Sequence, residues 1–191
     1  MQLKNLKTEF LGKNNIYYKE IDSTQNEIWN LYEQNSPNGT LVMADIQTSG
    51  RGTHGRIWHT DEPNNIAFSF FIRMDCNIKK LEGITIEIAK IIVNIFRNKY
   101  EINLKIKKPN DIVFNNKKIG GILTQTKVTG EIVKCLAIGI GINTNQEKFA
   151  KNINKIATSI KKEFNIDINT EEFIEEFCNE FEKEIIERIG K

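Results

Sequence analysis

The sequence predicts an α+β fold, with a mixed, largely antiparallel central sheet flanked by helices. Predicted strands and helices are intermixed along the chain. Three consecutive extended runs, 111–114, 118–127 and 131–142, are separated by residues 115–116 and 128–130, which are strong turn signals. Short turns join antiparallel strands, so this part is predicted to be an antiparallel meander. A chain of 191 residues is long enough to bury the core of one domain.

The first 73 residues are predicted to supply one helix and three strands. The helix is expected to begin at Thr24, because Glu27 three residues later gives the pattern of a capping box. Ile28 and Leu31 then recur at helical spacing. In order, we expect a weak helix or extended arm (1–14), a strand (16–21), this helix ending near 36–39, a strand (41–47), a long polar loop (48–64) and a strand (66–73).

The remainder of the chain begins with a long predicted helix over residues 81–100, whose isoleucines recur on one broad face. A strand over 102–107 and the meander follow. A short helix is expected near 154–164. The last helix is expected to start at Thr170, because phenylalanines recur every four residues from Phe173 onward.

Composition excludes several classes of protein. A net charge of +2 is too balanced to indicate a nucleic-acid or membrane partner. No run of about 18 apolar residues occurs, and the N-terminus lacks the apolar block of a signal peptide. Cys76, Cys135 and Cys178 are odd in number and too far apart for a disulfide framework or a zinc site. We therefore expect a reduced, cytoplasmic protein without a metal cluster.

Residues 50–56, Gly-Arg-Gly-Thr-His-Gly-Arg, form the first candidate binding element. Only five arginines occur in the whole sequence, and two of them, Arg51 and Arg56, lie here. Backbone N–H groups beside glycines can turn toward one anion, and a planar guanidinium binds phosphate or carboxylate through two hydrogen bonds. The stretch therefore predicts an anion-binding loop, with a flexible surface loop carrying two solvated cations as the alternative.

Polar or small residues also mark three later stretches. Residues 107–111, Lys-Lys-Pro-Asn-Asp, form a strong turn that could also hold a carboxylate and an amide beside two cations. Residues 117–123 and 136–143 place glycines inside strands, which weakens a strand unless a bulge or a close ligand requires them. Two such strands suggest a floor for a flat ligand, and tight packing of a helix on the sheet is the alternative.

Taken together and in order, these stretches resemble the biotin–protein ligase family. The resemblance covers residues from about 15 to about 145. It rests on the combination, since no single piece is specific. The matching motifs are Asp22-Ser23-Thr24, then Gln-x-x-Gly-Arg-Gly-x-x-Gly-Arg-x-Trp from Gln47 to Trp58, then Lys-x-Pro-Asn-Asp from Lys107, then Lys-Ile-Gly-Gly-Ile-Leu from Lys118, then Gly-Ile-Gly-Ile-Asn ending at Asn143.

The resemblance implies a biotin/lipoate protein ligase-like fold, related to class II synthetases, with residues 1–191 as a single catalytic ligase domain. It implies activation of biotin by ATP and Mg²⁺ to biotinyl-5′-AMP, followed by transfer to a lysine of a biotin carboxyl carrier protein, such as that of acetyl-CoA carboxylase. The resemblance implies either a monomer or a homodimer formed through the edge of the central sheet, of which we favour the homodimer. Neither DNA nor a membrane is expected as a partner.

The resemblance also implies roles for individual residues. Four are implied to be catalytic, Arg51, Lys118, Asp111 and Asn110. The residues implied to bind biotin are Ser23, Thr24, Gln47, Gly50, Arg51, Lys118 and Gly121. Those implied to bind ATP or the adenylate are Arg51, Gly52, Arg56, Trp58, Asn110, Lys118 and Asn143. No protein ligand for the metal is assigned, because Mg²⁺ is expected to arrive on the ATP phosphates. Whether Asp111 acts as a base toward the acceptor lysine or only orients it stays open.

The sequence departs from the family pattern at two positions. Thr53 stands where the family loop usually has a basic residue, which implies weaker retention of the adenylate. Lys108 replaces the usual tryptophan before Pro109, which leaves the packing of that turn open. The sequence also shows no N-terminal helix-turn-helix and no C-terminal β-barrel. We therefore expect no repressor function, and either a minimal ligase, a weaker one or one completed by a partner.

Three other functions remain as alternatives. A lipoate or octanoate ligase would share the fold, although its Arg-Arg-x-Ser-Gly-Gly-Gly loop is absent. A biotin-binding or sensing protein without turnover is favoured by Thr53 and Lys108. An RNA-binding domain using the basic loop is opposed by the balanced charge.

Overall fold

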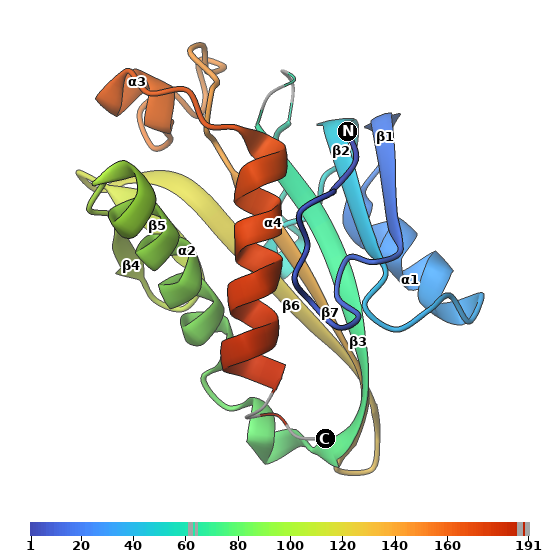
Figure 1. Ribbon diagram of the computed structural model, residues 1–191. Helices are drawn as coiled ribbons and strands as arrows, with labels where there is room; N and C mark the ends of the chain where they lie inside the picture. The colour runs from blue at the N-terminus through green and yellow to red at the C-terminus, as the bar shows by residue number, and fades with distance from the viewer. Residues whose placement is uncertain (61–62, 64, 187–188, 190–191) are drawn as a thin grey trace.

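A seven-stranded sheet, with strand order β1-β2-β3-β7-β6-β5-β4, runs through the middle of the molecule (Figure 1). The computed structural model describes residues 1–60, 63, 65–186 and 189. β1 and β2 pair in parallel, and the other neighbouring strands are antiparallel. The predicted mixed, largely antiparallel sheet is therefore confirmed. The strands are β1 (Asn15–Ile21), β2 (Leu41–Gln47), β3 (Ile66–Asn77), β4 (Lys105–Lys107), β5 (Asp111–Phe114), β6 (Lys117–Thr129) and β7 (Ile132–Ile142).

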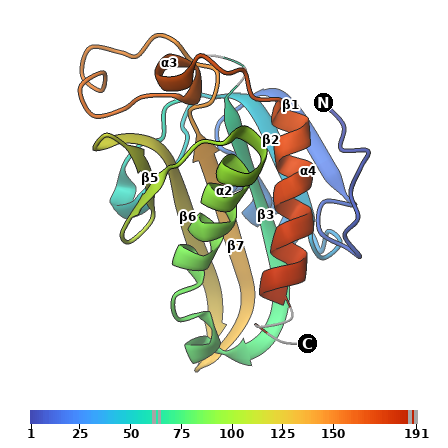
Figure 2. The same ribbon diagram turned by 60° about the vertical axis from the view of Figure 1, so that its left-hand side comes forward.

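The helices lie on both faces of this sheet. Figures 1 and 2 show α2 and α4 side by side on one face, and α1 packs on the other. Within the described ranges, none of the helices combines the length and the apolar character needed to cross a bilayer. The helices are α1 (Thr24–Glu33), α2 (Ile84–Tyr100), α3 (Ile160–Phe164) and α4 (Thr170–Phe181), with 3₁₀ turns η1 (Thr53–Gly55) and η2 (Ile78–Leu81) and the π-helical turn η3 (Glu182–Ile186).

The start of α1 corrects the predicted capping box. Ser23, not Thr24, is the N-cap, because its Oγ accepts a hydrogen bond of 3.4 Å from the backbone N–H three residues later. Thr24 is the first helical residue, and its hydroxyl is used in a contact with Gln47. The Glu27 carboxylate accepts from the Tyr18 hydroxyl at 2.9 Å. The Thr24 hydroxyl thus bonds to Gln47 and the Glu27 carboxylate bonds to Tyr18, so neither group forms the expected capping box.

Four other boundaries differ from the prediction for local reasons. α2 begins three residues later, because Gly83 adopts a left-handed φ of 78° that separates it from η2. β3 continues four residues further, pairing with β7 beyond a bulge. β4 lacks residues 102–104, because the N–H of Ile102 still bonds to the carbonyl of Phe96 at the end of α2. α3 begins at residue 160 rather than 154, where Ser159 provides its N-cap.

The face of the sheet under α2 and α4 holds most of the core. Alternate residues of β3 and β7 point to this face, as the period of two for a strand requires. Phe177 and Phe181 of α4 pack on them, with ring centroids 5.4 Å apart for Phe68–Phe177 and 5.0 Å apart for Phe70–Phe181. The phenylalanine stripe predicted for the last helix is thus confirmed as a core contact.

The opposite face of the same strands carries small residues. α1 covers one part of it, where Phe71 and Ala137 join a cluster with Ile28. Beyond that cluster, the residues of β3 and β7 that alternate with the core positions are small. Ser69 lies opposite Gly139 in this strip. A shallow space is therefore left on the α1 face of the sheet, and the candidate site occupies it.

Residues 1–14 form an extended arm, which was one of the two predicted states. The arm has no helix or strand of its own, and Leu3 and Leu11 bury their side chains in the core. Glu175 of α4 is only 6% exposed, and it accepts hydrogen bonds from the backbone N–H groups of Lys4 (2.5 Å) and Asn5 (2.7 Å). Burial alone raises the pKa of Glu175, but these hydrogen bonds lower its pKa overall.

Because Glu175 is the acceptor for this arm, we expect Glu175→Gln to lower the free energy of unfolding at pH 7 by about 1–3 kcal/mol. The backbone N–H groups of Lys4 and Asn5 then bond to a neutral oxygen, and Asn5 Nδ2 loses its acceptor, Oε2. The carboxylate has a lower pKa in the folded than in the unfolded chain. Its stabilisation is therefore present above about pH 4.3, the unfolded value, and is lost as the pH falls through the folded pKa. Urea unfolding at pH 7 and pH 3 measures this, with Glu180→Gln on α4 as the control. If Glu175→Gln lowers the free energy of unfolding by the same amount at both pH values, the prediction is contradicted.

Candidate active site

The loop after β2 folds back on itself as a narrow hairpin. The N–H of Trp58 donates to the carbonyl of Gly50 (2.8 Å), and the N–H of Gly52 donates to the carbonyl of Arg56 (2.7 Å). The η1 turn forms the tip of the hairpin. These N–H groups are used inside the loop, so the predicted cradle of free N–H groups is not formed in this conformation.

The two arginines of the loop bond to different partners. Arg51 Nη1 donates to Asn26 Oδ1 of α1 at 3.0 Å, and Arg56 Nη2 donates to Thr53 Oγ1 at 2.9 Å. Both side chains are exposed. In this structure the two guanidinium groups therefore have different partners and do not face one point. Arg51 lines an inner cavity, and Arg56 lines an outer one.

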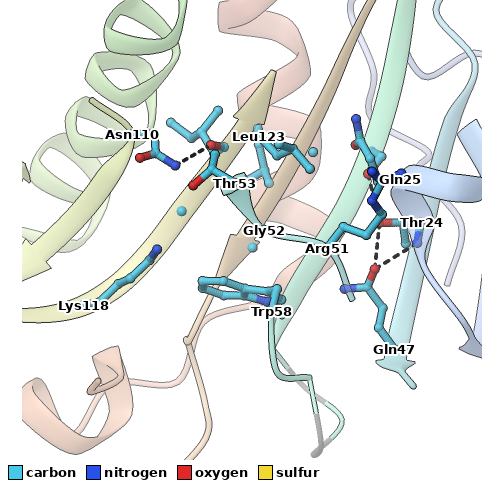
Figure 3. A pocket seen from close by; sticks show the side chains of 16 residues that line it. Thr24, Gln25, Gln47, Arg51, Gly52, Thr53, Trp58, Asn110, Lys118 and Leu123 are labelled. Atoms are coloured by element: carbon cyan, nitrogen blue, oxygen red, sulfur yellow. Dashed lines mark hydrogen bonds between the residues drawn. The ribbon is translucent and has the colours of Figure 1, made fainter. Parts of the chain in front are cut away.

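The inner cavity lies under the hairpin, on the α1 face of the sheet, and its empty space is about 420 Å³, including the part open to solvent. Figure 3 shows Thr24, Gln25 and Gln47 on one side of it, Lys118 and Asn110 on the other, and Trp58 between them. The start of α1, the end of β2, the first half of β6 and the end of β7 thus meet here. The lining residues are Thr24, Gln25, Gln47, Arg51, Gly52, Thr53, Trp58, Ser69, Asn110, Lys118, Gly121, Ile122, Leu123, Gly139, Ile140 and Gly141.

Uncharged polar groups line the end of this cavity next to α1. Gln47 Oε1 accepts hydrogen bonds from the backbone N–H (2.9 Å) and the hydroxyl (3.1 Å) of Thr24. The Thr24 hydroxyl also lies 2.9 Å from that of Ser69, and Gln47 Nε2 donates to Thr60 Oγ1 at 3.2 Å. All four residues are buried. A buried end of this kind suits a neutral polar group of a ligand, because charge is costly to bury.

The other end of the cavity carries the charge. Lys118 Nζ lies 2.6 Å from Asp111 Oδ1, with angles that do not make an aligned hydrogen bond. The same ammonium lies 5.5 Å from the centre of the Trp58 ring, within cation–π range. Asn110 is fixed beside it, because its Nδ2 donates to the carbonyl of Ile122 at 2.9 Å. Lys118 is partly exposed and therefore available to an anionic group that enters the cavity.

Glycines in β6 and β7 allow Trp58 to lie flat on the sheet. A Cβ added to Gly141 would lie 2.3 Å from Trp58 Cε2, which is closer than any real contact. A Cβ on its partner Gly121 would lie 3.1 Å from Lys118 Nζ and 3.4 Å from Trp58 Cζ3. The predicted floor for a flat ligand therefore exists, but the flat group that rests on Gly141 is the indole of Trp58.

Trp58 separates the inner cavity from an outer one, whose empty space is about 780 Å³, including the part open to solvent. The outer cavity has apolar walls, which include Phe149 and Ile153 from the segment between β7 and α3. Both cavities are lined by Gly52, Thr53, Trp58 and Lys118. The arrangement is one divided site, with a polar inner part, an apolar outer part and a cation at the junction.

The structure brings most of the predicted site residues together. Asp111 contacts Lys118 at the junction. Ser23 caps α1, and Gly50 contacts the backbone of Trp58, so both support the cavity without lining it. Lys108 is exposed, so the turn at Pro109 does not depend on burial of this side chain. Those predicted residues that line the inner cavity are Thr24, Gln47, Arg51, Gly52, Trp58, Asn110, Lys118 and Gly121, and those that line only the outer one are Arg56 and Asn143.

Asn143 has a structural role in addition to lining the outer cavity. Its Nδ2 donates to the carbonyl of Thr158 at 3.1 Å, and its backbone N–H donates to the carbonyl of Ile119 at 2.8 Å. Its carbonyl accepts from the N–H of Ile160 at 3.1 Å. Asn143 therefore ties the wall of the outer cavity to β6.

Sequence reasoning missed two polar residues of the inner cavity. Gln25 is 2% exposed although it follows Thr24 in a segment that reads as polar helix surface. Ser69 is 1% exposed in β3. Ser69 was detectable, because its neighbours from Ile66 to Ile72 in the strand are all apolar. Gln25 had no such signal, since its partner Gln125 is 100 residues away.

The described residues contain no group of three or more His, Cys, Asp or Glu side chains that could hold a metal ion. Asp111 supplies one carboxylate at the junction. Mg²⁺ sites in enzymes that use nucleotides commonly take one or two protein carboxylates and complete the shell with phosphate oxygens and water. The residues present thus fit a Mg²⁺ ion that arrives with a phosphate ligand, and not a protein cage.

Comparisons with known proteins agree with this geometry. The model of the biotin/lipoate A/B protein ligase family matches residues 17–143. The bifunctional ligase/repressor BirA of Bacillus subtilis is 40% identical over 159 residues, which are 82% of this chain and 49% of that protein. The biotin–protein ligase of Homo sapiens is 28% identical over 171 residues, which are 84% of this chain and 23% of that protein.

The fold comparison points the same way. The structure of a biotin protein ligase from Aquifex aeolicus in complex with biotin and ATP superposes with a TM-score of 0.72 and 30% identity, covering 90% of this chain and 73% of that chain. The chain spans about half the length of the BirA proteins of Bacillus that it matches.

Proposed function

Because the chain belongs to the biotin/lipoate A/B protein ligase family, we propose that it activates biotin with ATP and transfers it to a lysine of a biotin carboxyl carrier protein. One observation carries the proposal. An inner polar cavity and an outer apolar cavity meet at Lys118. Two adjoining cavities with a cation where they meet suit a reaction that joins an acid to a nucleotide.

The inner cavity suits the biotin head group. The ureido ring is neutral and polar, so its burial requires hydrogen-bond partners, and an unpaired group costs about 1–3 kcal/mol. Thr24 and Gln47 lie at the buried end and supply such groups. The valeryl chain would then extend along the glycines of β6 and β7, so that its carboxylate reaches Lys118.

The outer cavity suits the nucleotide. Its apolar walls and the exposed face of Trp58 provide a surface on which an adenine ring can stack. In this arrangement a carboxylate oxygen of biotin attacks the α-phosphorus of ATP, and the bond to the pyrophosphate oxygen breaks. Lys118 stabilises the negative charge of both groups as they approach, and Arg51 is close enough to assist after leaving Asn26.

The second step transfers the acyl group. The amine of the acceptor lysine attacks the acyl carbon, and AMP leaves. Asp111 lies beside Lys118 and would hydrogen-bond the incoming amine, while Asn110 holds the turn in place. Mg²⁺ bound to the ATP phosphates would supply additional charge neutralisation in the first step.

The wider assignments belong to the same proposal. We propose that residues 1–191 act as one catalytic domain, which the single sheet supports. The edge strands β1 and β4 have one unpaired side each within the sheet, which supports a homodimer formed through an edge. Three free buried cysteines support a reducing, cytoplasmic location.

The direct test is incubation of the protein with biotin, ATP, Mg²⁺ and a carrier domain, with mass spectrometry of the carrier lysine. We expect the mass of one biotinyl group, and none when ATP is omitted or the acceptor lysine is replaced by arginine. Pyrophosphate release without carrier separates turnover from binding alone. Labelling by lipoate in preference to biotin would reassign the substrate, and binding without pyrophosphate release would reassign the protein as a biotin sensor.

Thr53 provides a prediction about the intermediate. We expect Thr53→Arg to lengthen the lifetime of biotinyl-5′-AMP on the protein by about tenfold, because Thr53 lines both cavities and a cation there would hold the phosphate. Release of radiolabelled adenylate, measured after rapid gel filtration, gives the half-life. His54→Arg, at the neighbouring position of the loop and outside both cavities, is the control. Equal half-lives for Thr53→Arg and wild type contradict the prediction.

A further inference from the structure

Gln25 carries a buried oxygen that no described group satisfies. The residue is 2% exposed, it lines the inner cavity, and its Oε1 has no hydrogen-bond partner. A buried amide oxygen without a partner costs about 1–3 kcal/mol. The reaction proposed above does not use this group, since the described contacts of the polar end run through Thr24, Gln47, Ser69 and Thr60.

The orientation of the Gln25 amide is fixed by two residues that do not line the cavity. The indole N–H of Trp29 can only donate, and it donates to Gln125 Oε1 at 2.8 Å. That contact identifies this atom of Gln125 as the oxygen. Gln25 Nε2 also donates to Gln125 Oε1, at 3.0 Å. The Gln25 amide therefore presents its oxygen, not its nitrogen, on the side away from Gln125.

The sheet leaves room for this oxygen at the floor of the cavity. A Cβ added to Gly139 would lie 2.5 Å from Gln25 Oε1 and 3.2 Å from Ser69 Oγ. Oε1 thus lies over Gly139, a lining residue of the inner cavity. A side chain at residue 139 would exclude it, so glycine at this position and the unpaired oxygen fit together.

We propose that Gln25 is a specificity-determining residue whose Oε1 accepts a hydrogen bond from a ureido N–H of biotin, with Trp29 and Gln125 as positioning residues that hold the amide. This inference rests on the proposed function and adds a named contact to it. Gln47 Oε1 already accepts two hydrogen bonds from Thr24, whereas Gln25 Oε1 accepts none from the described residues. An unpaired acceptor selects a ligand with an N–H donor at that point.

The contact also predicts discrimination between acids. The dithiolane ring of lipoate has no N–H group, so it would leave Gln25 Oε1 buried and unpaired. A site with a buried polar group rejects a ligand that lacks the matching partner much more strongly than an apolar pocket rejects an extra group. Gln25 thus favours the ureido ring by penalising its absence.

The test is a cycle of biotin affinities measured by isothermal titration calorimetry on the full chain. We expect Gln25→Met, which keeps the length and removes the amide, to weaken biotin binding by about 10- to 100-fold. Trp29→Phe removes only the N–H that orients Gln125, and we expect it to weaken binding by about three- to tenfold in the wild-type background and to have no effect in the Gln25→Met background. Tyr32→Phe is the control, because Tyr32 lies on the same helix and takes no part in the hydrogen bonds among Trp29, Gln125 and Gln25.

A change of ligand gives a readout that altered folding does not produce. Biotin methylated at the ureido nitrogen that faces Gln25 should bind the wild-type protein more weakly than biotin does. To Gln25→Met, the methylated and the unmethylated ligand should bind equally. Methylation is tested at each of the two ureido nitrogens, because either one can face Gln25. The inference is overturned if Gln25→Met binds biotin as tightly as wild type, or if Trp29→Phe weakens binding equally in both backgrounds. A wild-type chain that binds no biotin overturns the proposed function as well, which separates the two failures.

Discussion

Lys118→Gln should lower kcat/KM for biotin-dependent pyrophosphate release by about 10²–10³-fold, the usual effect of removing one group that stabilises developing charge. Among the described residues, Lys118 is the one charged residue that lines both cavities. Glutamine keeps most of the length of the side chain but cannot neutralise a carboxylate and a phosphate that approach each other. Continuous measurement of pyrophosphate with biotin, ATP and Mg²⁺ gives the rate.

The neighbouring lysine provides the matched control for this change. Lys117→Gln removes the same charge one position earlier in β6, from a residue that lines neither cavity. We expect it to retain at least half of the wild-type rate. If Lys118→Gln keeps a rate within threefold of that of Lys117→Gln, the junction of the two cavities is not where the acid meets the nucleotide.

Gly141→Ala should disrupt the wall between the two cavities. The new methyl group would lie 2.3 Å from Trp58 Cε2, so the indole must leave the sheet. Overpacking of this kind usually costs about 1–3 kcal/mol of stability. We also expect the KM for ATP to rise by about tenfold or more, because the displaced indole no longer forms the wall of the outer cavity. Thermal unfolding and initial rates at varied ATP measure the two effects.

The steric cause predicts a specific non-additivity. In the Trp58→Ala background the Cβ at residue 141 meets no indole, so Gly141→Ala should there cost less than about 0.5 kcal/mol. An equal loss of stability in both backgrounds would show that Gly141 is required by the strand itself and not by Trp58.

The sequence predicts the sheet well because its strands alternate or end in clear turns. Residues 111–142 form the expected meander, and the phenylalanines from Phe173 onward pack on the sheet as expected. The parallel pairing of β1 with β2 was not predicted specifically, because the side-chain pattern of a strand carries little information about which strand lies beside it. The same limit applies to the capping of α1, because the Thr24 hydroxyl donates to Gln47, which is 23 residues away in the sequence.

The candidate site shows a similar division. Residues of the glycine-containing motifs gather around the cavities, because those motifs mark backbone that other groups approach closely. Their individual roles were less predictable. Gly141 makes room for Trp58, and the two loop arginines point to different partners. Gln25 was missed because the orientation of its amide depends on Trp29 and Gln125, whose positions are known only from the tertiary structure.

The extended arm at the N-terminus has a consequence for synthesis of the chain. Lys4 and Asn5 bond to Glu175, which is 171 and 170 positions away in the sequence. In a nascent polypeptide this arm emerges from the ribosome long before α4. The hydrogen bonds from Lys4 and Asn5 to Glu175 can therefore form only when α4 has cleared the exit tunnel.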